Sequence, residues 1–535
     1  KMPKNLIKKQ ELKPIILTQQ KPKFFMGTGN NHELVTQVLK TRPWWQQTED
    51  KDHCTLVWQQ WTPSQQFFIQ QRPNNICNHL AGNIELHSKI NLYKNVKKYL
   101  GRNAFKILMP TYQLYGQEKQ MFEQHFNYLK NPKEYEMKVE NEKPSDIEIE
   151  GRSQSTLPQL KLKKSDSTIK ITITQPNQQR SDSTVVKHKM QQKIYPEFKA
   201  TPIEQNEKNM WILKPEGLNR GFGIQVISSL EQIQQHIQEC RQQAPPLKPK
   251  TTKLPLKKDS KKSLSPQEHP QITLDQITKT HTFQQFLIQK YIENPLLFEG
   301  RKFDIRCYGL ITSRGDLYVY NQGYLRLTAA LFDISSTDMR THLTNNAVQK
   351  LLENYSQFEE GNMKTFQELD AVIEAKYQKS NHFSQEIWPK IKQSVADCMC
   401  SVGQRVLGQF PCTNCFELFG FDFMVREDLS YILIECNANP CLELSSPVSW
   451  ALIPELLDDV FDLTIDKQFK DQAVYEQLLG QKGKTAYVGK TVEDWRKIKP
   501  EDRQIEGMRW QELQRGLKVE RPNGFQLYGE KWAKK

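Results

Sequence analysis

Residues 416–443, FELFGFDFMVREDLSYILIECNANPCLE, place acidic and amide side chains within two apolar runs. The runs predict two β-strands joined by a polar turn at 426–430. Asp422 interrupts the first run, and side-chain alternation puts Glu435 and Asn437 on one face of the second. A carboxylate in an apolar strand is costly to bury unless a positive group meets it. Three such oxygen ligands suit a hard cation such as Mg²⁺, and a surface hairpin with solvated acids is the alternative.

The charge balance restricts the partners of this chain. The formal net charge is +14 over 535 residues, which favours an acidic partner such as a nucleic acid, an anionic membrane or an acidic protein surface. No apolar run approaches the roughly 18 residues of a membrane helix. We therefore expect no membrane segment and a cytosolic location. A mean hydropathy of −0.71 is low for one compact globule, so we expect two or three domains with polar inserts.

The ten cysteines do not form a regular framework. Cys412 and Cys415 form a CxxC, but Cys398 and Cys400 lie in a helical pattern in which they point to nearly opposite faces. Because zinc ligands must converge tetrahedrally, reduced thiols are the expected state.

Changes in composition divide the chain into five parts. These are an N-terminal extension (1–22), a small α/β domain (23–130), a Ser/Thr/Gln-rich disordered insert (131–200), a central and C-terminal region (201–467) and a polar extension (468–535). The α/β domain opens with a strand at 23–27 and a helix at 32–42 and contains a basic amphipathic helix at 83–100, and the segment 108–114 is expected to be its closing element. A lysine-rich insert at 241–270 is interpreted as a solvated linker or as a basic tether for a polyanion.

A glycine-bearing hairpin is predicted at 211–227. A short strand ends in Lys214, a turn follows with Arg220-Gly-Phe-Gly223, and a second strand begins after it. Backbone N–H groups of such a turn and a lysine beside it can surround phosphate oxygens, and an ordinary turn is the alternative.

Charged side chains also line one face of a strand at 300–311. Lys302, Asp304 and Arg306 alternate with apolar residues, and the next strand, at 317–328, brings Arg326 close. Clustered cations beside a magnesium site suit a reaction of a nucleoside triphosphate. Residues 342–346, HLTNN, add polar side chains at a helix start, where capping is the alternative role.

Taken in order, these segments resemble the ATP-grasp ligases and, among them, the tubulin tyrosine ligase-like family and its glutamylase-like members. The resemblance covers most of 23–467 and is carried by WILKP…RGFGI, QKYIENPLLFEGRKFDIR, HLTNNAVQK, FELFGFDFMV and IECNANPCLE. It implies an α+β fold: an ATP-grasp core of two α/β subdomains that sandwich ATP, a small α/β N-terminal domain and disordered basic inserts.

The resemblance also implies roles for individual residues. ATP would be bound by Lys89, Lys214, Arg220, Gly221, Phe222, Gly223, Gln289, Lys290, Tyr291, Ile292, Lys302, Asp304, Thr344 and Asn345. Mg²⁺ would be bound by Asp422, Glu435 and Asn437. Arg306 would stabilise charge on the reacting group, Arg326 would bind the carboxylate of the incoming amino acid, and Asn346 and Lys350 would also contact the substrate.

The implied activity is ATP-dependent ligation of a free amino acid to a tubulin tail through an acyl phosphate. An acidic tubulin tail matches a chain of net charge +14, and the implied location is the cytoskeleton, at a cilium, axoneme or basal body. Glutamate is the expected donor. Glycine or tyrosine is the alternative, because Asn346-Ala347 follow HLTN where well-known glutamate-adding members often carry an aromatic residue and a serine.

Two functions of other classes compete with ligation. One is a non-catalytic, microtubule-bound structural protein of cilia, which the intact set Asp422, Glu435 and Asn437 argues against. The other is a nucleic-acid binder, which the charge permits but for which neither an RNP-like motif nor a stripe of alternating aromatic and basic residues is present.

Overall fold

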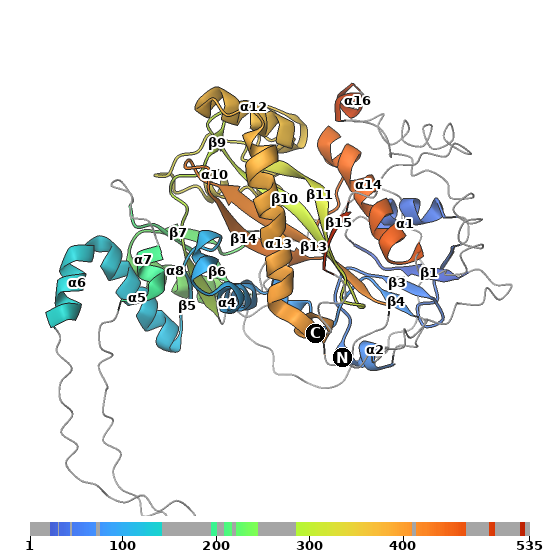
Figure 1. Cartoon of the computed structure of the whole chain (residues 1–535), viewed down its shortest axis with the longest axis horizontal. Helices are drawn as coiled ribbons and strands as arrows, with labels where there is room; N and C mark the ends of the chain where they lie inside the picture. The colour runs from blue at the N-terminus through green and yellow to red at the C-terminus, as the bar shows by residue number, and fades with distance from the viewer. Residues whose placement is uncertain are drawn as a thin grey trace, which may run out of the picture.

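The computed structural model describes most of the chain outside the predicted inserts and extensions. The described residues are 22–29, 32–42, 45–70, 75–141, 194–200, 208–216, 221–243, 285–408, 414–466, 492–497 and 525–529. Three sheets follow one another along the molecule, with the largest in the middle (Figure 1). None of the helices in these ranges has the length and apolar character needed to cross a membrane.

The N-terminal sheet is parallel and has the order β2-β1-β3-β4. Its strands are β1 (Lys23–Met26), β2 (Gln46–Thr48), β3 (Leu56–Trp58) and β4 (Ile76–Cys77). Helix α1 (His32–Lys40) follows β1 as predicted, and α2 (Gln65–Gln70) lies between β3 and β4. Arg42, just after α1, is fully buried and pairs with Asp458 and Asp466, which ties this sheet to the central region.

The basic helix predicted at 83–100 is two helices. Helix α3 (Ile84–His87) ends at Ser88, whose backbone is extended, and α4 (Lys89–Leu100) begins there. The hydroxyl of Ser88 accepts a hydrogen bond from the backbone N–H of Asn91, so Ser88 caps α4. A 3₁₀ helix, η1 (Gly101–Lys106), follows.

The second sheet is antiparallel, with the order β5-β8-β6-β7. Its strands are β5 (Thr111–Gln113), β6 (Trp211–Pro215), β7 (Gln225–Ile227) and β8 (Phe286–Lys290). Helices α5 (Gly116–Lys130) and α8 (Leu230–Gln243) pack against it. The segment 108–114 was expected to end the first domain, but its strand β5 pairs with β8, so it forms the edge of this second sheet.

The predicted insert at 131–200 begins and ends as helix. Its ends are α6 (Pro132–Asn141) and α7 (Pro196–Ala200), and Phe198 of α7 is buried and stacks on His125 of α5 with ring centroids 4.5 Å apart. The two ends of the segment predicted to be disordered are therefore helical. Residues 142–193 lie outside the described residues, and so does the lysine-rich insert apart from the end of α8 at Gln243.

The central sheet has the order β12-β11-β10-β13-β14, with β9 beside β10 and β15 beside β11. Its strands are β9 (Leu297–Phe298), β10 (Arg301–Thr312), β11 (Leu317–Leu327), β12 (Met363–Lys364), β13 (Phe416–Val425), β14 (Tyr431–Ala438) and β15 (Phe525–Gly529). All neighbouring pairs are antiparallel. Strand β15 shows that the polar C-terminal extension contributes to the core, because Phe525 packs on Tyr320 with centroids 4.8 Å apart.

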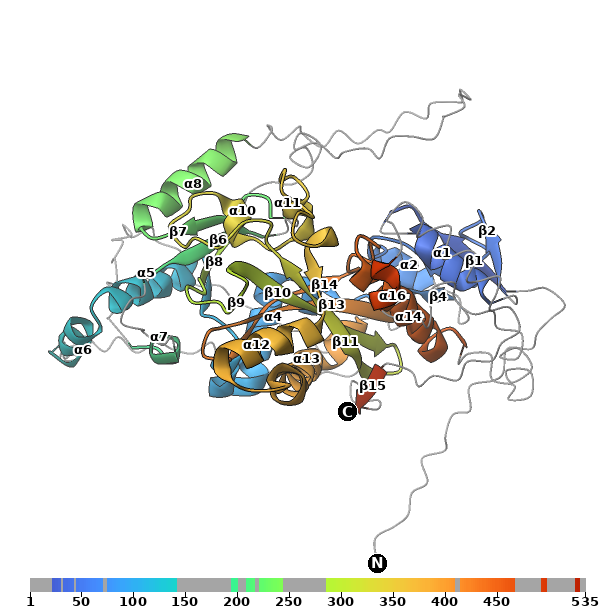
Figure 2. The same ribbon diagram turned by 90° about the horizontal axis from the view of Figure 1, so that it is seen from above.

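Helices cover both faces of the central sheet (Figure 2). Helix α12 (Phe366–Tyr377), the π-helical turn η3 (Phe383–Ile387), α13 (Trp388–Val402) and η4 (Gly403–Leu407) contribute apolar side chains to one core. Helix α14 (Pro447–Leu463) and the N-terminal sheet contribute to a second core on the other side. The remaining short helices are α10 (Met339–His342), α11 (Asn346–Gln349), η2 (Glu360–Asn362) and α16 (Val492–Arg496). The α+β expectation is confirmed, with an arrangement consistent with an ATP-grasp core.

Candidate active site

One cavity of about 580 Å³ lies where the second sheet meets β10, β13 and β14 of the central sheet. That volume lies within the usual range for small-molecule sites. The cavity is lined by Lys89, Lys214, Gly221, Gln289, Lys290, Tyr291, Ile292, Lys302, Asp304, Arg306, Arg326, Thr344, Asn345, Asn346, Lys350, Asp422, Glu435 and Asn437, so most of the predicted site residues converge. Phe222 and Gly223 are not among its lining residues, and Arg220 lies outside the described residues.

Two arginines and two aspartates form the floor of the cavity. The register places Asp304 opposite Arg326 and Arg306 opposite Asp422. Arg306 donates from Nε to Asp422 Oδ1 at 2.6 Å and from Nη2 to Oδ2 at 3.1 Å. Arg326 donates from Nε and Nη2 to the two oxygens of Asp304, each at 2.7 Å, and its Nη2 lies 2.8 Å from Asp422 Oδ2. The predicted alternation of charge along β10 is therefore an interlocked network of two-point ion pairs.

The two aspartates respond differently to this network. Burial raises the pKa of Asp422, but Arg306 and Arg326 outweigh burial and leave that pKa lowered. Burial raises the pKa of Asp304, and the nearby negative charge of Asp422 adds to this effect, so the pKa stays raised although Arg326 lowers it. Thr344 donates a further hydrogen bond to Asp304 Oδ2. The sequence had suggested that Asp304 and Thr344 face the nucleotide, and the structure adds that they contact each other.

The three predicted metal ligands lie together. Glu435 is directly opposite Asp422 in the register, and Asn437 Nδ2 lies 3.0 Å from Glu435 Oε1 and 3.3 Å from Asp422 Oδ2. Lys89 Nζ is 3.7 Å from Glu435 Oε2. Among the described residues, no group of three or more His, Cys, Asp or Glu side chains is arranged to hold a metal. Two carboxylates and an amide nevertheless fit Mg²⁺, which usually takes one or two carboxylates together with phosphates and water.

Zinc has no comparable set of ligands in the described part of the chain. Cys398 and Cys415 are buried and form no disulfide, and Cys412 lies outside the described residues. Burial raises the pKa of Cys398 above its ordinary value, which favours the protonated thiol rather than a zinc ligand.

Two lysines in the cavity are strongly desolvated. Burial lowers the pKa of Lys214 to about 8, with Glu435 opposing the shift and Lys89 adding to it. Burial and the charge of Lys214 lower the pKa of Lys302 to about 7, against the opposing effect of Asp304. Lys214 donates to Gln289 Oε1 at 2.8 Å, and Lys302 donates to the Tyr291 hydroxyl at 2.7 Å. An incoming polyanion would stabilise the charged form of both lysines.

The side chains of two residues predicted to bind ATP, Lys290 and Tyr291, contact other protein groups. Lys290 is buried and pairs with Glu293, whose carboxylate also accepts hydrogen bonds from the backbone N–H groups of Lys208 and Met210. The Tyr291 hydroxyl lies between Lys302 and His342 Nδ1. Because the Lys290 side chain is paired with Glu293, only its backbone remains for the predicted contact with ATP.

An apolar wall of the cavity was not predicted, apart from Ile292. Met109, Ile292, Met424 and Ile432 form one buried cluster, with Ile434 packed against it, and all but Ile432 line the cavity. A register shift between Asp422 and Phe423 marks an irregularity in the pairing of β13 and β14. This irregularity brings both Ile434 and Glu435 to the cavity, although strict alternation would send them to opposite faces. An apolar wall beside desolvated lysines suits a ligand with a flat base and a phosphate chain.

The segment 344–350 contributes Thr344, Asn345, Asn346, Ala347 and Lys350 to the cavity lining. The side chain of Asn345 accepts a hydrogen bond from the backbone N–H of Ala347 at 3.0 Å and so caps α11. Asn345 therefore has the capping role that the sequence offered as the alternative. Asn346 Oδ1 accepts a hydrogen bond from the Tyr355 hydroxyl at 2.8 Å. Lys350 forms an ion pair with Glu443, another cavity residue that was not predicted.

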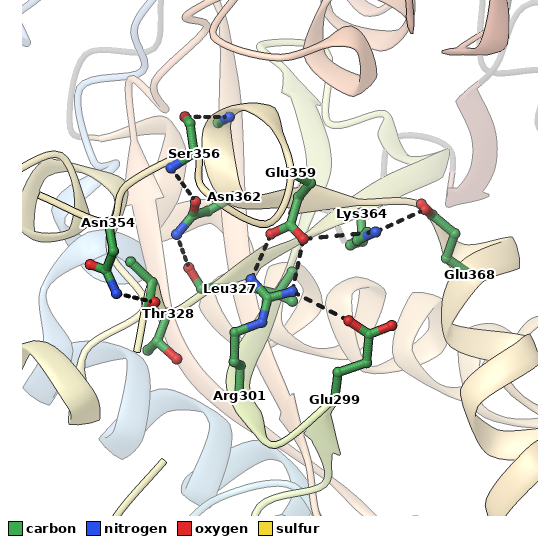
Figure 3. Close-up of polar contacts among 12 residues, drawn as sticks. Glu299, Arg301, Leu327, Thr328, Asn354, Ser356, Glu359, Asn362, Lys364 and Glu368 are labelled. Atoms are coloured by element: carbon green, nitrogen blue, oxygen red, sulfur yellow. Dashed lines mark hydrogen bonds and ion pairs between the residues drawn. The ribbon is translucent and has the colours of Figure 1, made fainter. Parts of the chain in front are cut away.

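Hydrogen bonds and an ion pair attach the segment 344–362 to the central sheet (Figure 3). Arg301 is fully buried and donates from Nη1 and Nη2 to the two oxygens of Glu359, at 2.8 and 2.7 Å. Asn354 and Asn362 donate to the backbone carbonyls of Ala329 and Leu327, just after Arg326. Residues 344–362 are thus held in a fixed position relative to the strand that carries Arg326.

Comparison with known proteins agrees with this geometry. The profile of the tubulin-tyrosine ligase family matches residues 155–473. The chain is 29% identical to the protein polyglycylase TTLL10 of Mus musculus over 55% of this chain and 39% of the relative. It is 30% identical to the tubulin glycylase 3D of Tetrahymena thermophila over 49% of this chain and 22% of the relative.

A third relative, from Homo sapiens, is called inactive polyglycylase TTLL10 and is 27% identical over 49% of this chain and 35% of the relative. The chain therefore spans between about a fifth and two fifths of the length of these relatives. The matched profile covers more than half of this chain and includes β6 to α14, the region that carries most of the cavity residues. The chain belongs to the tubulin-tyrosine ligase family.

Proposed function

We propose that this chain is an ATP-dependent ligase that joins glycine to carboxylates of a tubulin tail. The observation that carries the proposal is the pair of desolvated lysines, Lys214 and Lys302, which lie in one cavity with an apolar wall and with the acids Asp422 and Glu435. Such a combination matches the base, phosphates and counter-ion of a nucleotide.

The reaction takes place in two steps. A carboxylate oxygen of the acceptor attacks the γ-phosphorus of ATP, the bond from that phosphorus to the bridging oxygen breaks, and ADP leaves. The amine of the donor then attacks the acyl carbon, the new C–N bond forms, and inorganic phosphate leaves with the oxygen it received, while the amine proton passes to solvent.

The residues of this chain hold the charges during these steps. Lys214 and Lys302 bind phosphate oxygens, Arg306 stabilises charge that develops on the transferred group, and Arg326 binds the donor carboxylate. Asp422, Glu435 and Asn437 would hold Mg²⁺, which supplies neutralisation of the phosphate oxygens. Asn346 and Lys350, which the resemblance assigns to the substrate, line the cavity together with Glu443, and we call this part of the lining the donor end.

Glycine replaces glutamate as the proposed donor. The named relatives are glycylases, and the sequence had already left glycine open because Asn346-Ala347 follow the HLTN motif. At the donor end, Lys350 is paired with Glu443, so its charge is already compensated. Tubulin, the cytoskeleton and a ciliary location remain part of the proposal as the partner and the place of action.

Mass spectrometry tests this function directly. Tubulin is incubated with the purified chain, ATP and either glycine, glutamate or tyrosine, and the mass added to the tails is measured. We expect addition of glycine that depends on ATP. No addition of any amino acid, with ATP still bound, would favour the non-catalytic alternative, for which the name of the human relative is a precedent.

A further inference from the structure

The pair formed by Lys350 and Glu443 lies at the donor end of the cavity. Both residues line the cavity, and their side chains are about one third to two fifths exposed, at 35% and 42%. Glu443 lies beyond β14, and Lys350 directly follows α11, so the pair joins two walls of the same cavity. The ion pair is therefore part of the cavity wall and accessible to a ligand in the cavity.

Both partners are held by buried neighbours. Leu442, next to Glu443, is buried in the core shared with α14, and Ser446 begins α14 with a capping box. Gln349, next to Lys350, is fully buried and accepts a hydrogen bond from the backbone N–H of Ala329 at 2.6 Å. Its Nε2 donates to the carbonyls of Arg340 and Leu343. The backbones of the two charged residues are therefore fixed relative to each other.

Two other cations that line the cavity, Arg306 and Arg326, already have acidic partners. Arg306 is paired with Asp422, and Arg326 is paired with both Asp304 and Asp422. The neighbouring polar contact, between Tyr355 and Asn346, is uncharged. Burial raises the pKa of Tyr355 to about 12, the hydrogen bond to Asn346 opposes this shift, and the charge of Glu443 adds to it. A donor whose side chain carries a negative charge would meet Glu443 at this end, while Lys350 is compensated by Glu443.

We propose that Glu443 makes the donor site selective for amino acids without an acidic side chain, by compensating Lys350 and by repelling a second carboxylate. This inference rests on the proposed ligase function and specifies its donor class. The site binds the α-carboxylate and amine that every amino acid has, and it discriminates at the side chain. Lys350 would attract an acidic side chain but is neutralised by Glu443, and Glu443 itself repels such a side chain.

The test is a competition between glycine and glutamate as donors. Glu443→Gln removes the negative charge, keeps the shape and frees Lys350, so the ratio of kcat/KM for glutamate to that for glycine should rise by roughly fivefold or more at low salt. The rise should shrink as salt is added, because the pair is partly exposed. The KM for ATP should not change, which separates selectivity from a general structural effect.

Two further variants sharpen the result. Lys350→Met combined with Glu443→Gln removes both charges, so the ratio should return toward that of the wild type. Glu427→Gln is a matched control, because Glu427 forms a comparable exposed pair with Lys376, at 2.6 Å, outside the cavity. It should leave the ratio unchanged.

A binding measurement keeps this test independent of turnover. Calorimetry with a non-hydrolysable ATP analogue present gives the affinities for glycine and glutamate for each variant. If the wild type ligates or binds glycine and Glu443→Gln leaves the ratio where it was, the inference is wrong and the ligase proposal stands. If neither amino acid binds the wild type at all, the ligase proposal is wrong, and the inference is wrong with it.

Discussion

Arg306 and Asp422 are joined by two hydrogen bonds across β10 and β13, with Nε to Oδ1 at 2.6 Å and Nη2 to Oδ2 at 3.1 Å. Asp422 Oδ2 also lies 2.8 Å from Arg326 Nη2 and accepts a longer bond from Asn437. One predicted magnesium ligand is thus largely compensated by arginine. Glu435 is different, because its side chain is 24% exposed and its nearest cation, Lys89, is 3.7 Å away. Glu435 should therefore be the more available ligand.

Glu435→Gln should abolish most turnover without unfolding the protein. The amide keeps the shape but loses the charge that would hold Mg²⁺, and loss of a metal that offsets charge in phosphoryl transfer should lower kcat by about 10²-fold or more. Thermal melting with and without Mg-ATP is the control, because the wild type should gain stability from the ligand and the variant much less. Near wild-type ligation by this variant would disprove the proposed role of Glu435.

Arg326→Lys should raise the KM for the amino acid more than the KM for ATP. Lysine cannot form the two-point pairing that Arg326 makes with Asp304, and it presents a point charge rather than a planar fork to a carboxylate. Steady-state kinetics with each substrate varied in turn gives the two values. An equal rise in both would assign Arg326 to the nucleotide or to the network with Asp304 and Asp422.

Local sequence patterns predicted the strands and the charged face of β10. The ion-pair partners and the sheet to which a strand belongs depend on long-range strand pairing, which these patterns do not show. Alternation in KFDIR placed Lys302, Asp304 and Arg306 on one face because the period of a strand is a local property. The partner that neutralises Asp422 depends on the register of β10 with β13, which are more than a hundred residues apart in the sequence. The assignment of 108–114 to the second sheet depends on β8 in the same way.

Some residues were missed although they stand inside segments that had been singled out. Glu443 closes IECNANPCLE, and its role depends on Lys350, which is 93 residues away. Glu417, near the start of FELFGFDFMV, is fully buried and joins the N-terminal sheet to the central sheet. The sequence shows that both are acids in interesting segments, but their partners follow only from the fold.

Binding of a polyphosphate should take up protons near pH 8. Burial lowers the pKa of Lys302 to about 7 and that of Lys214 to about 8, so at pH 8 Lys302 is mostly neutral and Lys214 is half protonated. Phosphate oxygens favour the charged forms and restore the protons, so the affinity should fall as the pH rises from 7 to 9.

Calorimetry in buffers of different ionisation enthalpy measures this uptake with an ATP analogue. Lys302→Met should reduce it, whereas Lys119→Met, in α5 and away from the cavity lining, should not. Unchanged proton uptake in Lys302→Met would show that the titrating group is another one.

The contact between Glu417 and His79 should make stability depend on pH. His79 Nδ1 lies 2.9 Å from Glu417 Oε1, and Nε2 lies 2.9 Å from the carbonyl of Gln59, so both ring nitrogens face acceptors. Burial lowers the pKa of His79, but Glu417 more than compensates and the pKa is raised. The stability from this charge is therefore complete below the ordinary pKa of 6.5 and is lost as the pH rises through the raised value.

Glu417→Gln should remove this dependence and destabilise the junction of the two sheets. Glu417 also accepts hydrogen bonds from the backbone N–H of Leu80 and from Asn83 Nδ2, each at 2.8 Å, and one amide oxygen cannot replace two carboxylate oxygens. Breaking such a buried pair costs about 3–5 kcal/mol. Chemical denaturation at pH 6 and pH 8 measures the free energy of unfolding, and the difference between wild type and variant should be larger at pH 6. Equal differences at the two pH values would mean that His79 is neutral in the fold and that Glu417 acts only as a hydrogen-bond acceptor.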